Sequence, residues 1–432
     1  MEIEEKIQLI SRTTEEILTE EDLRELIESG QEIKHYIGFE ISGRVHLGTG
    51  LVCMQKVKDF IDAGIDCTIF LADWHAWIND KLNGNFETIK NVAVNYFKEA
   101  MKSAFECVGG DSSKLIFILG SDLYRGSEAY WETVIDVAKH VTLSRMQRSI
   151  TILGRKEGGD VDFAKLIYPV MQVADIYHMK INLPHAGMDQ RKAHVIVRDV
   201  ANKLQLHPLV NDKNEKIKPV AIHHSLLLGL GKPQKEVNVN SSEEEIREIT
   251  ESMKMSKSKE ASAIFIHDSE DAIREKIKKA YCPPRQIILN PILNWAKLLV
   301  FSSPDNRLEV KRDEKFGGIK FYSSYKILEE DFFKGDLHPL DLKNAIAEKL
   351  VDSNIYVYND AGYDNLLSVR EQIIITGLCN GDGCLNNIRE SLEKWDLLGH
   401  LLDKNRRVNR CVCCGKKAKY SILLGRKAKT EK

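Results

Sequence analysis

The first half of the chain alternates short apolar runs with longer amphipathic stretches. Five runs are rich in β-branched and aromatic residues: HYIGFE (35–40), CTIFLAD (67–73), KLIFILG (114–120), INLPHAG (181–187) and PVAIHH (219–224). Stretches with helical spacing of apolar residues lie between them, the clearest at 51–64, 86–105 and 190–204. This alternation predicts an α/β fold with a Rossmann-like, doubly wound and mostly parallel sheet. Ligands of such sheets bind beyond the carboxyl ends of the strands.

The pattern changes after the last of these strands. An acidic helical stretch passes into a loop rich in Lys and Ser at 241–265, and residues 269–350 are predicted to be mainly helical. The chain has 432 residues, which is long for one core, so several domains are expected. We predict a Rossmann-like domain at 1–235, a loop region at 236–268, a helical domain at 269–351 and an extension of unknown fold at 352–432.

Composition favours a soluble globular protein. Apolar residues make up 43% of the chain and charged residues 29%, and no run approaches the roughly 18 to 20 apolar residues that a membrane helix needs. The acidic, amphipathic start MEIEEKIQLI resembles no secretion signal. We therefore expect a cytoplasmic protein with no membrane partner.

Charge and cysteine content narrow the choice of partners. The net charge is −2, so binding of a nucleic acid would depend on local basic patches. An odd count of nine cysteines without a signal peptide argues against a disulfide framework. The segment from Lys404 to Lys432 has eleven Lys and Arg against one acidic residue, which favours phosphate binding that does not depend on sequence.

The stretch HLGTG follows the first predicted strand and opens a helix. The N-terminus of a helix presents unpaired N–H groups and positive potential, which suit a phosphate. Gly48 would let a nucleotide lie against the backbone, and His46 can donate to a phosphate oxygen. An HxG tripeptide alone is weak evidence, because a strand–helix corner with a surface histidine would look the same.

The second motif is KMSKS at 254–258, about 200 residues later and beyond the last predicted strand. Two lysines on a mobile loop can close on a triphosphate and neutralise charge on the departing pyrophosphate. A solvated Lys/Ser linker is the alternative. The order of the five residues and the pairing with HLG favour the nucleotide site.

The chain resembles the class I aminoacyl-tRNA synthetases, and among them the tyrosyl-tRNA synthetases of the archaeal and eukaryotic type. The resemblance covers about residues 10 to 350. It is carried by YIGFEISG (36–43), FLADWHAW (70–77), YPVMQVADI (168–176), AGMDQRKAH (186–194), KMSKSK (254–259), IREKIKKAYCP (273–283), KFGG (315–318) and LHPLDLKNAIAEKL (337–350). The family has His at the fourth position of its HxGH signature, where this chain has Thr49.

Three polar residues are spaced as one helix face, at i, i+4 and i+7: Tyr168, Gln172 and Asp175. From the spacing alone, an ordinary buried hydrogen-bond network explains them equally well. The resemblance implies that Asp175 and Tyr36 hold the phenolic OH of tyrosine. It also implies that Tyr168, Gln172 and Gln190 hold the α-amino group. His75 and the pair Leu123–Tyr124 fall where the family lines the tyrosine side chain, although His75 could be a satisfied polar residue at a strand end.

The implied reaction is attack of the tyrosine carboxylate on the α-phosphorus of ATP, followed by transfer of tyrosine to the 3′ end of tRNA(Tyr). The implied catalytic residues are His46, Thr49, Lys254 and Lys257. The implied ATP-binding residues are Gly38, Glu40, His46, Gly48, Lys254, Met255, Ser256, Lys257 and Ser258. Mg²⁺ is expected to arrive with ATP. Since Thr49 has a shorter side chain than histidine and is never cationic, we expect it to contribute less than His46.

The resemblance also implies contacts with tRNA and a second subunit. Arg148, Arg191 and Lys192 match positions near the acceptor stem, and Phe316, His338 and Asp341 match positions around the first anticodon base. Core packing of Phe316 and a helix N-cap at Asp341 are the structural alternatives. Homodimerisation is implied through a segment inserted at about 125–165.

The C-terminal extension lies outside the resemblance. Cys379, Cys384, Cys411 and Cys414 could supply four thiolates to a structural zinc ion, but the spacing is loose and Cys413 is left over. An unstructured basic extension is the alternative.

Two other functions stay open from the sequence. A tryptophan–tRNA ligase would share the fold, and a catalytically silent tRNA-binding paralogue could carry Thr49 as a sign of decay. The intact KMSKS stretch and the complete set of tyrosine-pocket residues speak against the second.

Overall fold

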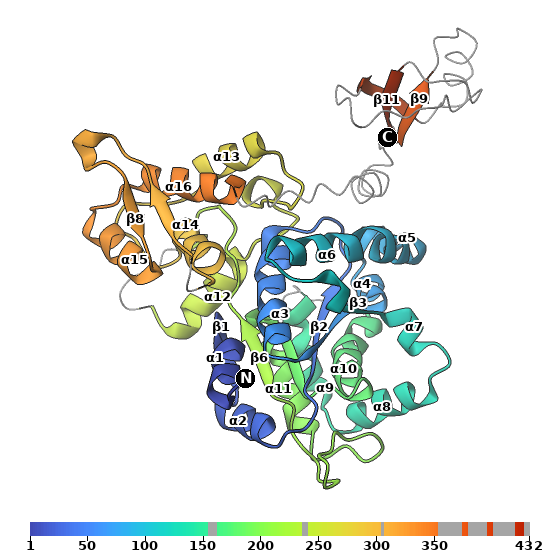
Figure 1. Ribbon diagram of the computed structural model, residues 1–432. Helices are drawn as coiled ribbons and strands as arrows, with labels where there is room; N and C mark the ends of the chain where they lie inside the picture. The colour runs from blue at the N-terminus through green and yellow to red at the C-terminus, as the bar shows by residue number, and fades with distance from the viewer. Residues whose placement is uncertain are drawn as a thin grey trace.

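The computed structural model describes residues 1–153, 162–235, 241–303 and 306–352, together with three short strands nearer the C-terminus. A twisted sheet formed by strands between Thr14 and His224 lies at the centre of the N-terminal half, with helices on both faces (Figure 1). The sheet has six strands: β1 (Thr14–Leu18), β2 (Lys34–Glu40), β3 (Asp66–Ala72), β4 (Ile116–Leu119), β5 (Leu183–Gly187) and β6 (Ala221–His224). The last five correspond to the five predicted strands.

The strand order is β1-β6-β5-β2-β3-β4. All neighbouring pairs are parallel except β1–β6, which is antiparallel. From β2 the chain moves outward to β3 and β4, then returns to the other side of β2 to form β5 and β6. The order therefore reverses between β2 and β5, and the predicted α/β doubly wound class is confirmed.

Alternating side chains of the strands supply two hydrophobic cores. Ile37 and Ile69 face one core, whereas Tyr36 and Phe70 face the other. The first core is covered by α1 (Ile3–Ser11), α3 (Cys53–Asp62), α5 (Phe86–Val92) and α6 (Lys98–Cys107), and the second by α8 (Glu128–Lys139), α10 (Phe163–His178) and α11 (Arg191–Val200). Both faces of the sheet are buried, as expected for parallel strands.

Several shorter helices connect these elements: α2 (Glu20–Glu28), α4 (Asp73–Ile78), α7 (Gly120–Tyr124) and α9 (Leu143–Ser149). Single-turn π-helical segments precede α3 at Gly48–Val52 and follow α5 at Ala93–Phe97.

A buried lysine joins the N-terminal helix to the helix that follows HLGTG. The ammonium of Lys56, on α3, donates to the carbonyls of Leu9, Ile10 and Arg12 at the end of α1, and Asp59 is within 3.8 Å. The side chain is 1% exposed, and burial lowers the pKa of Lys56 to about 7. The three carbonyls satisfy the three ammonium protons, so α1 is tied directly to α3.

The chain returns to the start of α3 after the KMSKS stretch. Helix α12 (Glu243–Met253) begins with a capping box formed by Ser242 and Glu245 and ends where Lys254 begins the motif. Backbone N–H groups of Leu47 and Ile266 then donate to the carbonyls of Ile264 and Val45, at 3.0 and 3.1 Å. These bonds join the segments that carry the two motifs.

The segment predicted to be mainly helical also contains a hairpin. Its helices are α13 (Glu270–Lys278), α14 (Pro291–Trp295), α15 (Tyr325–Lys334) and α16 (Pro339–Asp352), and its two short antiparallel strands are β7 (Leu308–Val310) and β8 (Lys320–Tyr322). Runs of three residues are too short to show a period of two, which explains why sequence patterns did not predict the hairpin.

Three strands of the extension form an antiparallel sheet in the order β10-β11-β9. Their bounds are β9 (Ile374–Leu378), β10 (Trp395–His400) and β11 (Tyr420–Arg426). The four cysteines of the predicted zinc site lie outside the described residues. Within the described part of the chain, none of the helices has both the length and the apolar character that a membrane crossing requires.

Candidate active site

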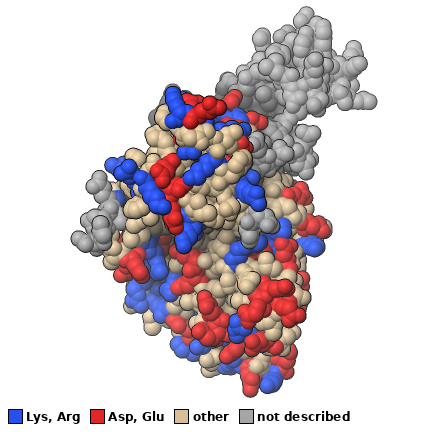
Figure 2. Space-filling view, turned by 60° about the vertical axis from the view of Figure 1, so that its left-hand side comes forward, with Lys and Arg blue, Asp and Glu red and all other residues tan. Residues whose placement is uncertain are grey.

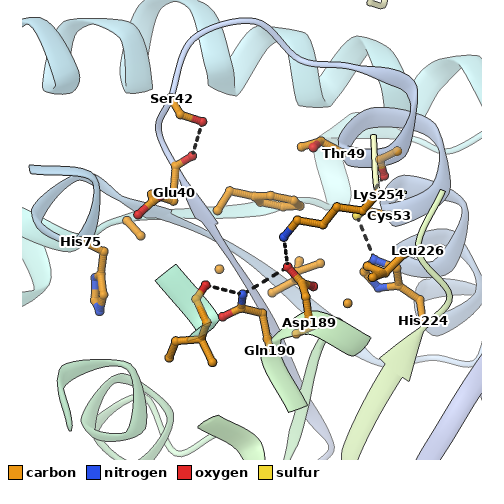
Figure 3. A pocket seen from close by; sticks show the side chains of 18 of the residues that line it. Glu40, Ser42, Thr49, Cys53, His75, Asp189, Gln190, His224, Leu226 and Lys254 are labelled. Carbon is orange, nitrogen blue, oxygen red and sulfur yellow. Dashed lines mark hydrogen bonds and ion pairs between the residues drawn. The ribbon is translucent and has the colours of Figure 1, made fainter. Parts of the chain in front are cut away.

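A cavity of about 760 Å³ opens at the carboxyl ends of β2, β3, β5 and β6. It lies where the strand order reverses, which is the expected ligand position on a doubly wound sheet. Apart from Leu123 and Tyr124, the residues predicted to bind tyrosine or ATP all line it: Tyr36, Gly38, Glu40, His46, Gly48, Thr49, His75, Tyr168, Gln172, Asp175, Gln190, Lys254, Met255, Ser256, Lys257 and Ser258. Figure 3 shows part of this wall, including His75, Gln190 and Lys254.

Asp175 lies at one end of the cavity and is fully buried. Its Oδ1 accepts from the phenolic OH groups of Tyr124 and Tyr130, at 2.9 and 3.1 Å. Its Oδ2 has no hydrogen-bond partner, and the nearest ring nitrogen is Nε2 of His75 at 3.6 Å. Burial raises the pKa of Asp175 to about 8. One oxygen is thus held by the protein, and the other remains able to bond a hydroxyl group of a ligand.

Tyr36 and His75 complete this end of the cavity. A Cβ atom at Gly38 would lie 2.6 Å from the phenolic oxygen of Tyr36, so only glycine lets the Tyr36 ring lie over the strand there. His75 is 2% exposed, neither of its ring nitrogens has a partner, and burial lowers its pKa to about 3. A neutral imidazole with both nitrogens unpaired is expected to bond to a bound molecule rather than to the protein.

Two predictions about this end of the cavity were wrong. Leu123 and Tyr124 are absent from the cavity wall. Leu123 is half-buried and packs against the second core, whereas Tyr124 is buried in it and donates its OH to Oδ1 of Asp175. Tyr130 was not predicted at all, because its place on α8 gives no periodic signal beyond that of a core residue.

The predicted amino-group contacts come together beside α10. Tyr168, Gln172 and Asp175 share one face of this helix, as their spacing indicated. Gln172 Nε2 donates to Oε1 of Gln190 at 3.4 Å, while the Oε1 of Gln172 is buried without a partner. Gln190 Nε2 donates to the carbonyl of Ile152 at 3.1 Å. An unpaired amide oxygen at this point is suited to accept from an ammonium group.

His46 and Thr49 are hydrogen-bonded to each other. The backbone N–H of Thr49 donates to Nδ1 of His46 at 3.2 Å, and Oγ1 of Thr49 lies 3.3 Å from Nε2. Burial first, and then Lys257, lowers the pKa of His46 to about 3, so the ring is neutral. Since Nδ1 accepts, the partners assign the ring proton to Nε2, which donates to Thr49 Oγ1. The hydroxyl proton of Thr49 is then available to a ligand.

Gly48 lets these two residues adopt this arrangement. A Cβ atom there would lie 3.3 Å from the His46 ring and 3.3 Å from the Cβ of Leu227. Any larger side chain would displace the imidazole.

Each lysine of KMSKS has a partner in the cavity. Lys254 Nζ forms an ion pair with Oδ2 of Asp189 at 2.6 Å, which Figure 3 shows. Burial acts to raise the pKa of Asp189, but the ammonium outweighs it and the net shift is downward. Lys257 Nζ donates to Oγ of Ser42 at 2.6 Å, and burial lowers the pKa of Lys257 to about 8.

Asp189 and Ser42 were missed from the sequence. Asp189 precedes Gln190 at the carboxyl end of β5, and a polar residue at that position could have been flagged as a ligand contact. Its pairing with Lys254, 65 residues away, has no local signal.

The predicted acceptor-stem residues lie near one another. Arg148 and Lys192 are exposed, and Lys192 Nζ lies 3.4 Å from the carbonyl of Arg148. Arg191 is held at Nε by both carboxylate oxygens of Glu16, on β1, at 2.8 Å. Glu16 was not predicted, because β1 itself was not.

The predicted anticodon contacts lie on two neighbouring turns. Phe316 is 63% exposed, so the core-packing alternative for it is wrong. Arg312 bridges the turns by donating to the carbonyls of Gly318 and Asp336, at 3.2 and 3.1 Å. The positive φ angles of Gly317 and Gly318, 96° and 64°, form the sharp turn beside Phe316.

Asp341 is not the N-cap of its helix. Helix α16 begins at Pro339, which places Asp341 in the first turn, and the ring Nδ1 of His338 accepts from the N–H of Leu340. The N-cap alternative for Asp341 is therefore wrong.

Comparison with known proteins gives four matches of different weight. Residues 28–353 match the family described as tRNA synthetases class I (W and Y). A tyrosine–tRNA ligase of Thermococcus sibiricus is 54% identical over 353 residues, which are 82% of this chain and 93% of that protein. The crystal structure of tyrosyl-tRNA synthetase complexed with L-tyrosine from Pyrococcus horikoshii is 52% identical, with a TM-score of 0.82, and covers 86% of this chain and 100% of that one. A tryptophanyl-tRNA synthetase of Aeropyrum pernix, at 16% identity and a TM-score of 0.56 over 81% of this chain and 83% of that one, shows the shared fold alone.

Proposed function

The chain belongs to the class I tRNA synthetases of the tryptophan and tyrosine group, and from that premise we propose roles for its cavity residues. Its activity is tyrosine–tRNA ligation. It activates tyrosine with ATP to tyrosyl-adenylate and pyrophosphate, then transfers tyrosine to tRNA. The tryptophan alternative has only the shared fold in its favour.

The unpartnered Oδ2 of Asp175 is the observation that supports selectivity for tyrosine. It is a buried acceptor at the closed end of the cavity, and the phenolic OH of tyrosine fits it. Tyr36 and His75 flank the same point. A ligand without the hydroxyl group would leave Oδ2 buried and unpaired, which costs free energy. Gln172 and Gln190, with Tyr168, receive the ammonium group nearer the opening.

In the first step, an oxygen of the tyrosine carboxylate forms a bond with the α-phosphorus of ATP, and the bond from that phosphorus to pyrophosphate breaks. His46 Nε2–H is shared between Thr49 Oγ1 and a phosphate oxygen, and the Thr49 hydroxyl donates to a second phosphate oxygen. Lys254 and Lys257 leave Asp189 and Ser42 to neutralise the departing pyrophosphate. No protein nucleophile takes part, so positioning and electrostatics carry the catalysis.

In the second step, a hydroxyl of the 3′-terminal adenosine attacks the tyrosyl carbonyl, and AMP leaves. Mg²⁺ enters with ATP as part of the substrate. Within the described residues, no group of three or more His, Cys, Asp or Glu side chains is placed to hold a metal ion. The zinc site in the extension stays a prediction.

Tyrosine-dependent exchange of pyrophosphate into ATP tests this function. The purified chain is expected to catalyse exchange with tyrosine and not with tryptophan. Well-folded protein that binds tRNA but supports no exchange would instead be the silent paralogue.

His46 is expected to contribute more than Thr49. His46→Ala removes a donor and also the group that orients the Thr49 hydroxyl, so the rate of adenylate formation should fall about 100-fold. Thr49→Ala removes one neutral donor, so a fall of about tenfold is expected. Single-turnover rates measure both, with Thr49→Ser as a control that keeps the hydroxyl. A larger loss for Thr49→Ala than for His46→Ala would reverse the ranking.

Two chains assemble through the outer side of α8 in this proposal. Trp131, Ile135, Leu143 and Phe163 are large, apolar and exposed on or beside this helix. Apolar side chains gathered on one surface indicate a protein contact. Ile135→Glu would place a charge in that contact and should yield monomers in sedimentation experiments. Ile327→Glu, at an exposed isoleucine on α15, is the control, and a dimer that survives Ile135→Glu would argue against this surface.

tRNA meets local basic and aromatic groups. On the face of the molecule seen in Figure 2, basic and acidic side chains are interspersed and do not form one continuous basic surface. Arg148, Arg191 and Lys192 form the acceptor-stem contacts of the proposal, with Arg191 oriented by Glu16. Phe316, His338 and Asp341 form the anticodon contacts.

Phe316→Ala should lower the charging of tRNA but leave pyrophosphate exchange unchanged. Stacking of one base on an aromatic ring is worth about 1–3 kcal/mol, so kcat/KM for tRNA should fall about 5- to 150-fold. Phe321→Ala is a matched control, because Phe321 is equally exposed, at 66%, on neighbouring β8. Equal effects of the two substitutions would mean that Phe316 has no special role.

A further inference from the structure

Three buried histidines cross the sheet in a diagonal line toward the cavity. His35 lies on β2, His185 on β5 and His224 on β6, which are neighbouring strands. The register pairs Ile37 with His185 and Gly187 with His224, so each histidine stands two residues nearer the carboxyl ends than the last. The three side chains lie between the sheet and α3.

The rings are hydrogen-bonded in sequence. His35 Nε2 lies 3.1 Å from His185 Nδ1, and His185 Nε2 lies 2.7 Å from His224 Nδ1. His224 Nε2 lies 3.5 Å from Sγ of Cys53, the first residue of α3, as Figure 3 shows. The thiol of Cys53 donates to the carbonyl of Gly48 at 3.3 Å. The chain therefore ends at the HLGTG turn.

All four groups are buried and electrically neutral. Burial lowers the pKa of His35 to about 3 and of His224 to about 4, lowers the pKa of His185, and raises the pKa of the Cys53 thiol. Each neutral ring has one donor and one acceptor, so the line can be ordered in only two directions.

One direction satisfies more groups than the other. If His35 donates to His185, His185 to His224 and His224 to Cys53, the thiol keeps its bond to Gly48. Only the lone pair on His35 Nδ1, which is buried without a partner, is left over. The reverse order would turn the thiol away from Gly48 and bury an unpaired N–H at His35 instead, which costs more.

The ordered chain acts on His46 through Gly48. Gly48 is covalently joined to Thr49, whose backbone N–H donates to Nδ1 of His46 at 3.2 Å, so a shift of Gly48 moves the hydrogen-bond partner of the imidazole. Buried polar chains of this kind fix a unique arrangement but add little net stability over an apolar core.

We propose that His224 is a positioning residue for ATP, because the chain from His35 to Cys53 fixes the Gly48 carbonyl and so the turn that presents His46 and Thr49 to phosphate. The inference rests on the proposed function. It predicts that His224 and Cys53 affect the KM for ATP and not the KM for tyrosine, because the tyrosine contacts Tyr168, Gln172 and Asp175 lie on α10.

Pyrophosphate exchange with separate KM values for ATP and tyrosine tests the inference. His224→Asn cannot reach Cys53, so the KM for ATP should rise about three- to tenfold, as for one lost hydrogen bond, with that for tyrosine unchanged. His224→Gln places an amide N–H near the position of Nε2 and should restore the ATP value. Thermal melting of each variant checks folding.

Cys53→Ala is a second, independent test, because it removes only the thiol that connects His224 to the Gly48 carbonyl. It should raise the KM for ATP as His224→Asn does, while Cys53→Ser should not. Cys67→Ala is the control, because Cys67 is an equally buried thiol on β3 that bonds only backbone carbonyls.

The outcomes separate the inference from the function on which it rests. Wild-type protein without tyrosine-dependent exchange would refute the function. Active wild type with an unchanged KM for ATP in folded His224→Asn or Cys53→Ala, or with equal rises for both substrates, would refute the inference. Should His224→Asn fail to fold, Cys53→Ala decides.

Discussion

Above pH 8, where Asp175 with its pKa of about 8 is ionised, Asp175→Asn should lower kcat/KM for tyrosine in pyrophosphate exchange by about 10- to 150-fold relative to the wild type at the same pH, while the KM for ATP stays the same. The range corresponds to about 1.5–3 kcal/mol, the usual worth of a hydrogen bond to a charged group. The carboxylate holds two phenolic OH groups on Oδ1 and leaves Oδ2 for the substrate. An asparagine amide offers one acceptor and one NH₂ donor, so one of these contacts must be lost.

The same substitution should also reduce discrimination against phenylalanine. In the wild type, phenylalanine leaves Oδ2 buried and unpaired, and that penalty shrinks when the group is a neutral amide. Exchange rates with both amino acids, measured side by side, give the ratio. Tyr130→Phe is the graded comparison, because it removes one donor to Oδ1 and leaves Oδ2 intact. A full loss of tyrosine selectivity in Tyr130→Phe but none in Asp175→Asn would contradict the assignment.

Lys257 should impose a pH dependence on the reaction with ATP. Burial lowers the pKa of this lysine to about 8, with Glu40 opposing the shift. The ammonium that attracts phosphate is present below about pH 8 and is lost as the pH rises through that value. Because kcat/KM reports groups of the free enzyme, kcat/KM for ATP should fall above about pH 8 with the slope of one proton.

Lys257→Arg is the decisive comparison. Arginine stays protonated throughout this range, so the falling limb should move to higher pH even if the maximum rate drops. Lys257→Ala should lower the rate at every pH by about 100- to 1000-fold, as for loss of a charge contact made in the transition state. A falling limb that stays at the same pH in Lys257→Arg would assign it to another group.

Local patterns predicted the parts of the fold that depend on local preferences. The five central strands are short β-rich apolar runs, and α10 has helical spacing of both its apolar residues and its polar cavity residues. Strand β1 was missed because TEEIL is charged and lies at the edge of the sheet, where pairing with β6 determines its conformation. The hairpin β7–β8 was missed because its strands are only three residues long.

In the cavity, too, local sequence patterns predicted some residues and contacts between distant parts of the chain determined the others. Motif residues with a fixed spacing, such as His46 with Gly48 and Lys254 with Lys257, could be predicted as a group. Their partners could not, because the contacts join distant parts of the chain: Asp189 meets Lys254 across 65 residues, and Cys53 meets His224 across 171. Hydrogen-bond direction and burial, which decide the roles of these groups, exist only in the folded chain.

The tie between Lys56 and α1 changes where a minimal catalytic fragment can begin. The family match starts at residue 28, beyond α1 and β1. A fragment cut at that boundary would keep Lys56 but lose all three carbonyls that it binds, and it would lose Glu16, which holds Arg191. A catalytic fragment that is to keep these contacts must therefore include α1 and β1.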